Sequence, residues 1–531
     1  MPLQNIPLHQ TGYFSKLMCN YLAKDASTTS FYHRFPALDQ FKLQLEEKQT
    51  SFPMENRSVL VKELQAQYAG LSVSEATQQN IVSLSSENTF TITTGHQLNL
   101  FTGPLYFLYK IFSVINLSER LNDTYTNQHF VPVYWMASED HDFDEINYFN
   151  FQGKKLAWDR SSGGAVGELS NEGLDAVLKV VQAAFGNSKN GQHLATLFSD
   201  AYVKHQNLAD ATRYLGNQLF KEYGLVIIDA NRSSLKKAFI PYAELELTEN
   251  RSFKTVTQTT ESLVAAGYGE QVHPREINLF YVIEGIRERI VEKGGQFHIN
   301  DTDLSFTSEE IIAELSIYPE RFSPNALLRP LYQEVILPNL CYTGGGGELA
   351  YWFQLKDYFK SVEVPFPILQ LRNSVLLVAS KYTAKLKNLH LEVAALFQKQ
   401  HELTAAFTKE LSKINIDFSD QKEHLKKQFA DLYELAKKTD ASFVGAVAAQ
   451  EKKQLNGLAH LEKRLLKAQK RKWADQLERL VAIQNKLFPG QSLQERNSNF
   501  SEFYLEHGER LFSELKENLD PLLHEFTVLE L

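Results

Sequence analysis

The segment Thr93–Lys110 (TTGHQLNLFTGPLYFLYK) holds residue types that contact anions, with Gly95, His96 and Gln97 after an apolar run and Gly103 before a helical pattern. A glycine lets the backbone approach a ligand closely, and free N–H groups at a helix start attract anions. A histidine beside such a loop can donate a hydrogen bond to a phosphate or a carboxylate. The alternative is a buried histidine whose ring is satisfied by a backbone carbonyl.

A second segment, Ser138–Asn147 (SEDHDFDEIN), crowds acidic residues around a histidine, and Asp140, His141 and Asp142 are its candidates for catalysis. It could bind the ammonium group of a substrate, hold Mg²⁺ through carboxylates and water, or act as a general base. A zinc site is less favoured, because the second nearby His or Cys that it needs is missing, and we assign no residue as a metal ligand. The acids could equally be solvent-facing residues at a helix start.

A third segment, Cys341–Tyr351 (CYTGGGGELAY), places four glycines before a helical stretch, and Gly344, Gly345, Gly347 and Glu348 are candidate ligand contacts. It lacks the Lys-Ser/Thr ending of a Walker loop. Its backbone amides could still surround a polar or anionic ligand. The alternative is a flexible turn, although four glycines cost folding entropy that a turn does not require.

Two arginines near these segments, Arg329 and Arg372, could hold a carboxylate or a phosphate, because the guanidinium fork matches both. Either could instead be a structural ion-pair partner. The sequence has no Ser-His-Asp or Cys-His arrangement for nucleophilic catalysis, and Cys341 is interpreted as a small buried residue.

Four short apolar runs end at or near these polar groups, and each is followed by polar residues and a helical pattern. Runs that are apolar throughout are typical of buried parallel strands. The pattern predicts an open α/β sheet, in which ligands bind beyond the carboxyl ends of the strands. The four runs are Phe90–Thr94, Val131–Ser138, Leu225–Ile228 and Phe366–Leu371.

From about residue 381 to 487 the apolar residues recur at a spacing of three and four, which is typical of long helices and coiled coils. Breaks at Asn415–Asp420 and near Thr439–Ser442 predict an antiparallel helical hairpin. This stretch has 21 Lys and Arg against 13 Asp and Glu, a net of +8, which leaves −17 for the rest of the chain. Its basic run Lys463–Lys472 could touch nucleic acid, but a solvated helix face is the simpler interpretation, and the apolar seam favours dimerisation.

Composition excludes several classes of protein. The 531 residues suggest two to four folding units, and the net charge of −9 does not indicate a general nucleic-acid binder. Two distant cysteines, Cys19 and Cys341, exclude a disulfide scaffold and a Cys-rich zinc module. We see no signal peptide and no apolar run long enough to span a bilayer, so we expect a cytoplasmic protein with no membrane partner.

Taken together, four motifs in order resemble the BshC family, the cysteine-adding ligases of bacillithiol biosynthesis, and the tail LQERNSNF (493–500) fits the same family. In that family the glycine motif usually has a proline where this chain has Gly346, which loosens the loop. The motifs are TGHQLNLFTGPLYFLYKI (94–111), PVYWMASEDHDFDEIN (132–147), FSPNALLRPLYQE (322–334) and YTGGGGELAYW (342–352).

The resemblance implies a Rossmann-like, nucleotidylyltransferase-type catalytic core with inserted connecting segments (1–380), a coiled-coil arm that makes a homodimer (381–488), and a segment packing back on the core (489–531). It implies ligation of L-cysteine to the glucosamine amine of glucosaminyl-malate, with ATP and Mg²⁺. In fold relatives a histidine-glycine signature contacts ATP phosphates, which by analogy places Gly95, His96 and Gln97 in the active cleft.

Two other functions fit parts of the same pattern. A nucleotidylyltransferase or other adenylate-forming enzyme would share the core and the ATP. A coiled-coil interaction protein without catalysis would explain the helical hairpin, although it would have no need for the dense polar groups at the strand ends.

Overall fold

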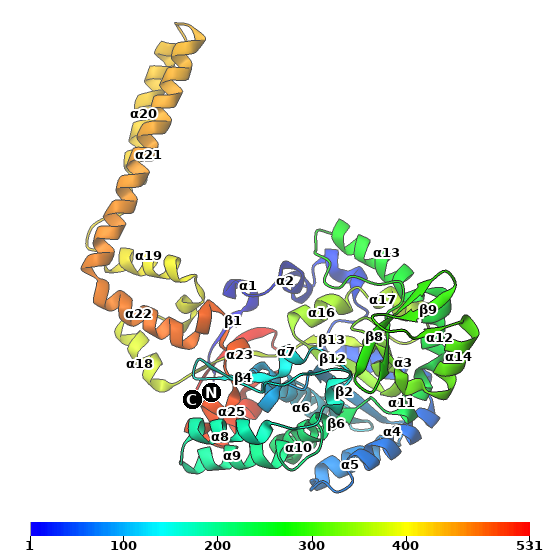
Figure 1. The fold of residues 1–531 in the computed structure, drawn as a ribbon. Coiled ribbons are helices and arrows are strands. Elements are labelled where there is room, and N and C mark those ends of the chain that lie inside the picture. The colour runs from blue at the N-terminus through cyan, green and yellow to red at the C-terminus, as the bar shows by residue number, and fades with distance from the viewer. Residues whose placement is uncertain (1) are drawn as a thin grey trace. The chain divides into compact units, whose positions relative to one another are not determined.

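The computed structural model describes the backbone of residues 2–531 and the side chains of residues 4–531. The chain divides into two compact units, shown in Figure 1. The first comprises Met1–Leu377 together with Gln494–Leu531, and the second comprises Val378–Leu493. The chain therefore leaves the first unit, forms the second, and returns to complete the first.

The first unit is built around a five-stranded parallel sheet, which confirms the α/β fold expected from the apolar runs. All four predicted strands belong to it, and a fifth strand, β12, joins them between β13 and β2. The strands are β2 (Thr89–His96), β3 (His129–Met136), β6 (Val226–Asp229), β12 (Asn339–Gly344) and β13 (Ile368–Leu371).

The order of the strands explains where a ligand can bind at the edge of this sheet. The order is β13-β12-β2-β3-β6, so the chain proceeds from β2 to β3 and β6 in one direction and later places β12 and β13 on the other side. The connections on either side of the β2–β12 pair therefore lead in opposite directions. At such a switch point the loops separate and leave a crevice beyond the carboxyl ends of the strands.

Both faces of the sheet are covered. Every residue of β6, β12 and β13 is buried, and successive side chains of a strand point to opposite faces. Helices that pack on these strands include α3 (Leu38–Ser51), α4 (Met54–Gln67), α6 (Tyr106–Thr124) and α10 (Leu208–Phe220). Helix α6 begins at Tyr106, just after the predicted Gly-Pro start, and its residues from Phe107 to Ile115 are all buried.

Smaller sheets complete the strands of the described chain. An antiparallel sheet has the order β10-β9-β8-β7-β11, a three-stranded sheet has the order β1-β15-β14, and β4 pairs with β5. Their bounds are β1 (Pro2–Pro7), β4 (Tyr148–Phe151), β5 (Lys154–Ala157), β7 (Leu279–Ile283), β8 (Ile286–Lys293), β9 (Gln296–Ile299), β10 (Ser305–Phe306), β11 (Phe322–Pro324), β14 (Ser374–Val378) and β15 (Glu525–Glu530).

The remaining α-helices of the first unit are mostly short connections around the sheets. No helix within residues 2–531 combines the length and apolarity needed to cross a membrane. The helices are α1 (Leu8–Thr11), α2 (Lys16–Leu22), α5 (Glu75–Ser83), α7 (Phe143–Ile146), α8 (Leu174–Phe185), α9 (Lys189–Tyr202), α11 (Ser233–Lys236), α12 (Ile240–Glu249), α13 (Arg251–Ala265), α14 (Ser308–Ile317), α15 (Arg329–Ile336), α16 (Gly346–Trp352), α17 (Lys356–Ser361), α23 (Gln494–Asn497), α24 (Phe500–His507) and α25 (Arg510–Asn518).

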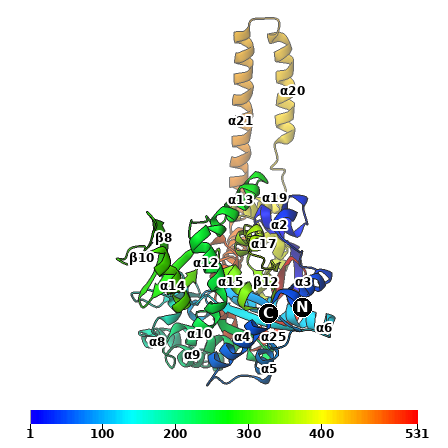
Figure 2. The ribbon, with the colours of Figure 1, turned by 90° about the vertical axis from the view of Figure 1, so that its right-hand side faces the viewer.

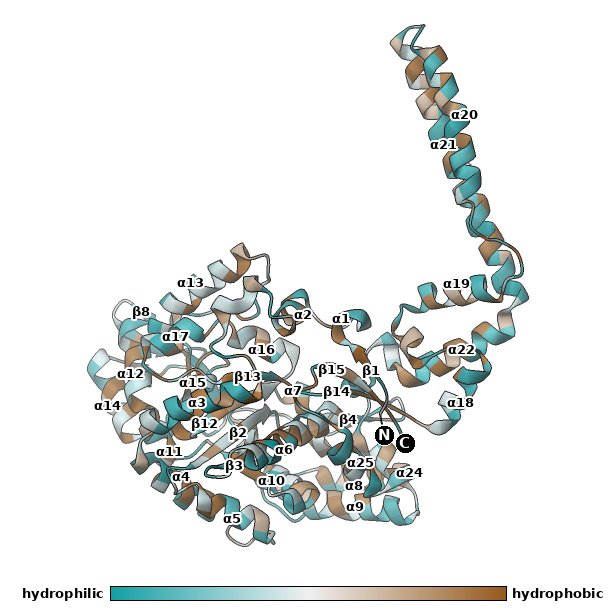
Figure 3. Cartoon of the chain, turned by 180° about the vertical axis from the view of Figure 1, so that it is seen from behind, coloured by the Kyte–Doolittle hydropathy of each residue, from teal (hydrophilic) through white to brown (hydrophobic). Residues whose placement is uncertain are grey.

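The second unit is helical, and both predicted breaks are confirmed. Helices α20 and α21 lie side by side as a hairpin, and Figure 2 shows the tight turn that joins them. Figure 3 shows hydrophobic and hydrophilic residues alternating along both helices, as an apolar seam requires. The seam contains Phe429 and Val447. The helices of this unit are α18 (Ser380–Asn388), α19 (Gln400–Leu411), α20 (Ser419–Ala436), α21 (Ala441–Lys472) and α22 (Ala474–Leu487).

Candidate functional site

A cavity of about 280 Å³ lies at the carboxyl ends of β2, β3 and β12, where the strand order reverses. Strand β2 contributes Gly95 and His96, and the loop after β3 contributes Ser138–Asp140. Helices α15 and α16 contribute Arg329 and Glu348 from the other side of the switch point. Three predicted segments, far apart in the sequence, therefore meet in one cavity. We call it the switch-point cavity.

His96 is the buried base of this cavity, with 6% of its surface exposed. Its ring packs against Phe107 with the centroids 4.9 Å apart. Burial and the positive charge of Lys110 hold the pKa of His96 well below its ordinary value, against a hydrogen bond with the Thr102 backbone that raises it. The ring is therefore neutral at pH 7, and its Nε2 has no hydrogen-bond partner in the described part of the chain.

The protonation of this ring decides what it can offer a ligand. A neutral imidazole has one donor and one acceptor nitrogen. A backbone hydrogen bond that raises a histidine pKa is one that the ring donates, so we assign the proton to Nδ1, facing Thr102. Nε2 of His96 then presents a lone pair, which suits a proton acceptor better than the anion-contacting donor expected from the sequence.

The buried Lys110, on α6, forms an ion pair with the partly exposed Glu348 at the edge of the cavity. Its Nζ also donates a hydrogen bond of 2.7 Å to the carbonyl oxygen of Gly95, and the Tyr342 hydroxyl donates to Glu348 Oε2 at 3.1 Å. Burial lowers the pKa of Lys110, and the carboxylate of Glu348 opposes that shift. The sequence analysis did not select Lys110, although a lysine within an apolar helix is the signature of a paired buried charge.

Asp140 and Arg329 carry opposite charges in the cavity, and both are available to bind a ligand. Burial raises the pKa of Asp140, while Arg287 and Arg329 lower it. The Asp140 carboxylate has no ion-pair partner within 4.0 Å among the described residues. Among the described residues, Arg329 donates to neutral groups alone, the amide oxygen of Gln333 at 3.1 Å and the Tyr351 hydroxyl at 3.2 Å. Its charge therefore remains available to an anion.

The switch-point cavity brings together only some of the residues selected from the sequence. His141 and Asp142 are exposed and lie outside its lining, and the Arg287 guanidinium donates to His141 Nδ1 at 2.6 Å. The predicted residues that line the cavity are Gly95, His96, Gln97, Asp140, Arg329 and Glu348. Those that do not are Gly103, His141, Asp142, Gly344, Gly345, Gly347 and Arg372.

Arg372 forms a structural ion pair, the second of the two interpretations that the sequence allowed. Its Nη2 lies 2.7 Å from Glu495 Oε1, and both side chains are buried. The other oxygen of Glu495 accepts a hydrogen bond of 3.1 Å from the Val375 backbone. This pair ties the returning segment of the chain to the sheet edge.

The glycine run lets side chains approach the start of α16. A Cβ at Gly344 would lie 2.8 Å from Glu348 Oε2 and 2.9 Å from the Tyr342 ring, closer than real Cβ contacts. A Cβ at Gly346 would lie 3.1 Å from Met18. Glycine is therefore required at 344 so that Glu348 can fold back toward Lys110.

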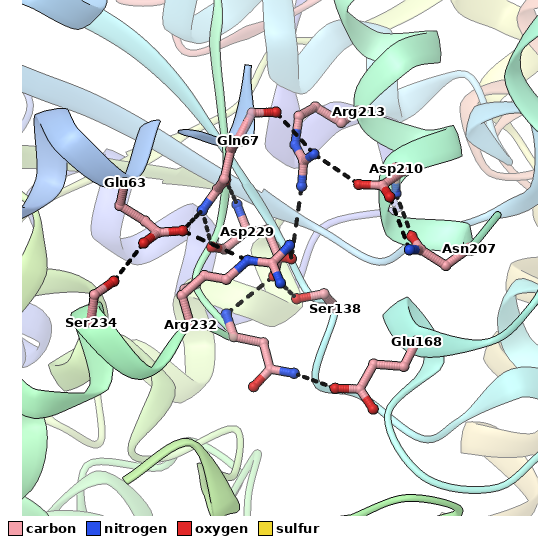
Figure 4. A network of polar contacts seen from close by, with 12 residues as sticks. Glu63, Gln67, Ser138, Glu168, Asn207, Asp210, Arg213, Asp229, Arg232 and Ser234 are labelled. Atoms are coloured by element: carbon pink, nitrogen blue, oxygen red, sulfur yellow. Dashed lines mark hydrogen bonds and ion pairs between the residues drawn. The ribbon is translucent and has the colours of Figure 1, made fainter. Parts of the chain in front are cut away.

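Behind the cavity, Asp229 at the end of β6 organises a network of polar contacts, drawn in Figure 4. The Ser138 hydroxyl donates to Asp229 Oδ1 at 2.5 Å, and Arg232 Nη2 lies 2.9 Å from Oδ2. The Gln67 amide brackets the Asp229 backbone, accepting from its N–H at 3.0 Å and donating to its carbonyl at 2.8 Å. The network fixes the start of the loop that carries Asp140.

The loop between β2 and α6 has an unusual backbone. Phe101 and Thr102 have φ angles of 47° and 67°, in the left-handed region that costs a non-glycine residue about 1–3 kcal/mol. Gly103 follows with φ 63°, and a Cβ there would lie 2.7 Å from that of Asn99. The Asn499 amide holds this conformation by donating to the carbonyls of Phe101 at 2.8 Å and Gly103 at 2.5 Å.

Among the described residues, no group of three or more His, Cys, Asp or Glu side chains is arranged to hold a metal ion. The acids of the Ser138–Asn147 segment diverge instead. Glu139 pairs with the buried Lys236, whereas Glu145 accepts a hydrogen bond of 3.1 Å from Gln97.

Comparison with known proteins gives matches over the whole chain. The family model described as "Bacillithiol biosynthesis BshC, N-terminal Rossmann-like domain" matches residues 1–373, and that described as "Bacillithiol biosynthesis BshC, C-terminal coiled-coil domain" matches residues 375–531. Relatives named "Putative cysteine ligase BshC" occur in Flavobacterium johnsoniae, with 54% identity over 100% of both chains, and in Christiangramia forsetii, with 53% identity over 100% of this chain and 99% of the relative. A relative of the same name in Cytophaga hutchinsonii is 39% identical over 98% of this chain and 97% of its own length. With its Rossmann-like sheet and its coiled-coil hairpin, this chain belongs to the BshC family of bacillithiol biosynthesis.

Proposed function

We propose that this chain ligates L-cysteine, through its carboxyl group, to the glucosamine amine of glucosaminyl-malate. The names of the relatives support the cysteine ligase class. The observation that carries the proposal is the switch-point cavity, which combines a free carboxylate, a free guanidinium and a neutral histidine. Amide formation between an amino acid and an amine uses one group of each kind.

Asp140 and Arg329 divide the charges of the amino acid between them. The Asp140 carboxylate holds the ammonium of cysteine, and the Arg329 guanidinium holds its carboxyl group or the anion attached to it. Burial strengthens both interactions, because the local dielectric constant is lower than that of water. Glu139 and Glu348 are neutralised by Lys236 and Lys110, so the cavity does not repel an anion near Arg329.

Amide formation from a free carboxylate is uphill, and ATP with Mg²⁺ would supply the activation of the cysteine carboxyl. The residues present fit an anionic group of this kind, because Arg329 forms no ion pair with a carboxylate of residues 4–531 and Lys110 also lines the cavity. The described residues hold no metal cluster of their own, so the Mg²⁺ would arrive bound to the nucleotide.

His96 accepts the proton that the attacking amine must lose. The amine nitrogen forms a bond to the activated carboxyl carbon, the leaving group departs with its electron pair, and the nitrogen releases a proton. The neutral Nε2 of His96 has a lone pair and no protein partner, so it can take that proton.

We propose that the second unit makes a homodimer. Helices α20 and α21 bury few residues, and several large apolar side chains remain exposed along them: Leu432, Leu435, Phe443 and Leu461. A second hairpin is the partner whose apolar seam matches these positions. Sedimentation equilibrium checks this: the mass should equal two chains, and Leu435→Glu should shift it toward one chain, whereas Lys427→Glu on the exposed side should not.

The function is tested by incubating the purified protein with glucosaminyl-malate, cysteine, ATP and Mg²⁺ and measuring product masses. A product heavier than glucosaminyl-malate by one cysteinyl residue is expected, and the nucleotide formed, ADP or AMP, identifies the activation route. A folded protein that makes no such product, but releases pyrophosphate with other carboxylic acids and amines, would contradict the proposal in favour of another adenylate-forming enzyme.

A further inference from the structure

We propose that a second cavity, beside the first, binds the amine-bearing substrate, and that Arg496 binds a carboxylate of that substrate. This inference rests on the ligase function proposed above and adds the place and the chemistry of the second substrate. The ligand class is a polyhydroxylated amine that carries a carboxylate, such as an amino sugar linked to a dicarboxylic acid.

The second cavity has a volume of about 430 Å³, and we call it the acceptor cavity. It adjoins the switch-point cavity, because Gln97 and Tyr106 line both. A ligase that joins two substrates needs two adjoining sites whose contents meet at one boundary. A molecule in the acceptor cavity can present its amine past Gln97 toward His96, the preceding residue of the chain.

Charges in the acceptor cavity match an amine and a carboxylate on one molecule. Arg496 is exposed, and its guanidinium has no hydrogen-bond or ion-pair partner within residues 4–531. Asp144 and Glu145 are the acids of the lining, and Glu145 Oε2 accepts a 3.1 Å hydrogen bond from Gln97 Nε2. A ligand whose carboxylate lies at Arg496 and whose ammonium lies at Glu145, near Gln97, would neutralise the charges at both ends of the acceptor cavity.

The remaining lining suits hydroxyl groups. Asn99 and Asn150 each offer a donor and an acceptor, which is the combination that a hydroxyl group needs, and Tyr148 adds an aromatic ring. Asn99 is 8% exposed, and its Oδ1 has no hydrogen-bond partner among the described residues, whereas its Nδ2 donates to the Glu145 carbonyl at 3.2 Å. A buried acceptor without a partner at this wall indicates a ligand group that donates to it.

The acceptor cavity is also held rigid on the side that presents Arg496. The neighbouring residue Glu495 forms the buried ion pair with Arg372, at 2.7 Å. Three residues after Arg496, Asn499 donates hydrogen bonds to the carbonyls of Phe101 and Gly103, and Gly103 lines the cavity. These contacts fix the backbone on both sides of Arg496, so less backbone entropy is lost when its guanidinium binds a carboxylate.

The test is titration calorimetry of glucosaminyl-malate into the full-length protein without cysteine or ATP. The variants are Arg496→Gln, Arg496→Lys and the control Arg510→Gln, an exposed arginine paired with Glu514 outside both cavities. Methyl glucosaminide, which lacks the malate carboxylates, is the matched ligand. We expect Arg496→Gln to weaken glucosaminyl-malate binding about tenfold, Arg496→Lys to retain part of it, and methyl glucosaminide to bind all proteins equally.

Binding of glucosaminyl-malate that is equal in Arg496→Gln and the wild type overturns the inference, even if the wild type makes the cysteinyl product. Binding that depends on Arg496 in a protein that makes no such product supports the acceptor cavity and refutes the ligase function. If binding needs the other substrates, steady-state kinetics decide: the KM for glucosaminyl-malate should rise in Arg496→Gln with the KM for cysteine unchanged, and unchanged KM values for both overturn the inference.

Discussion

Two polar centres lie at the same edge of the parallel sheet, and they are satisfied to different degrees. At the end of β6, both carboxylate oxygens of Asp229 have partners: Ser138 and the Asn231 backbone on one, and Arg232 on the other. At the end of β2, one strand beyond β3, Nε2 of His96 is buried without any partner in the described residues.

The difference separates a structural centre from a binding centre. A buried polar group without a hydrogen bond costs about 1–3 kcal/mol, and a ligand in the adjoining cavity that supplies the missing partner of His96 recovers that cost. Loss of a residue from the Asp229 network should therefore lower stability, whereas loss of His96 should lower activity. The predictions below test this division, beginning with the largest expected effect.

Asp229→Asn should lower the free energy of unfolding by about 3 kcal/mol, because it removes a buried carboxylate that lies 2.9 Å from Arg232 and accepts from Ser138, and leaves Asp210 as the carboxylate paired with the buried Arg213. Urea denaturation followed by tryptophan fluorescence measures this loss. The matched control is Asp175→Asn, an exposed residue in the first turn of α8, which should cost less than about 1 kcal/mol. If the two variants lost the same free energy of unfolding, the Asp229 network would have no special role in stability.

His96→Ala should reduce ligase turnover about 100-fold or more, because the acceptor for the amine proton is lost. Its thermal unfolding temperature should fall by only a few degrees, since the lost packing against Phe107 and the lost bond to Thr102 are partly offset by removal of a buried polar atom without a partner. His193→Ala, on the exposed side of α9, is the control and should retain full turnover. Normal turnover in a folded His96→Ala protein would exclude His96 from the chemistry.

Asp140→Asn should reduce turnover about tenfold, mainly through a weaker interaction with the cysteine ammonium. Burial raises the pKa of Asp140, so the folded state disfavours its charged form. The stability that this shift contributes is present below the ordinary aspartate pKa and is lost as the pH rises through the raised value. Asp140→Asn should therefore be more stable than the wild type at pH 7 and equally stable near pH 3; a difference that is constant with pH would contradict this.

Arg120→Gln should have the smallest effect of these variants. Arg120 forms a two-oxygen ion pair with Asp520 at 2.9 and 3.0 Å, but both side chains are about half exposed. Exposed ion pairs contribute about 0–1 kcal/mol, so the unfolding free energy should change by less than about 1 kcal/mol and turnover should stay unchanged. A loss as large as that of Asp229→Asn would show that the number of contacts, and not burial, sets the effect.

Local patterns in the sequence predicted four of the five strands of the parallel sheet and the helical hairpin. Continuous apolar runs such as Val131–Ser138 are typical of strands covered on both faces, and the breaks at Asn415–Asp420 and Thr439–Ser442 interrupt an otherwise continuous helical repeat. Strand β12 was missed because it contains the polar residues Asn339 and Thr343, and the apolar Val335 and Ile336 before it belong to helix α15.

The site could be predicted only in part, because the residues that line it depend on the directions of their side chains, which local sequence patterns do not specify. His96 and Asp140 line the switch-point cavity as selected, whereas His141, next to Asp140, turns toward Arg287 on β8. Arg372 meets a carboxylate 123 residues later in the chain, a partner that no local pattern identifies. The assignment of catalytic and binding roles stays a prediction until the variants are measured.

Because the second unit is inserted between Leu377 and Gln494, the two parts of the first unit are synthesised at different times. A ribosome adding about 5–20 residues per second needs roughly 6–23 seconds to make the intervening segment. Throughout that interval Arg372 lacks Glu495, β14 lacks β15, and the Phe101–Gly103 loop lacks Asn499. The nascent chain therefore exposes an unpaired strand edge and an incomplete site, and it becomes a candidate client for chaperones until its last residues emerge.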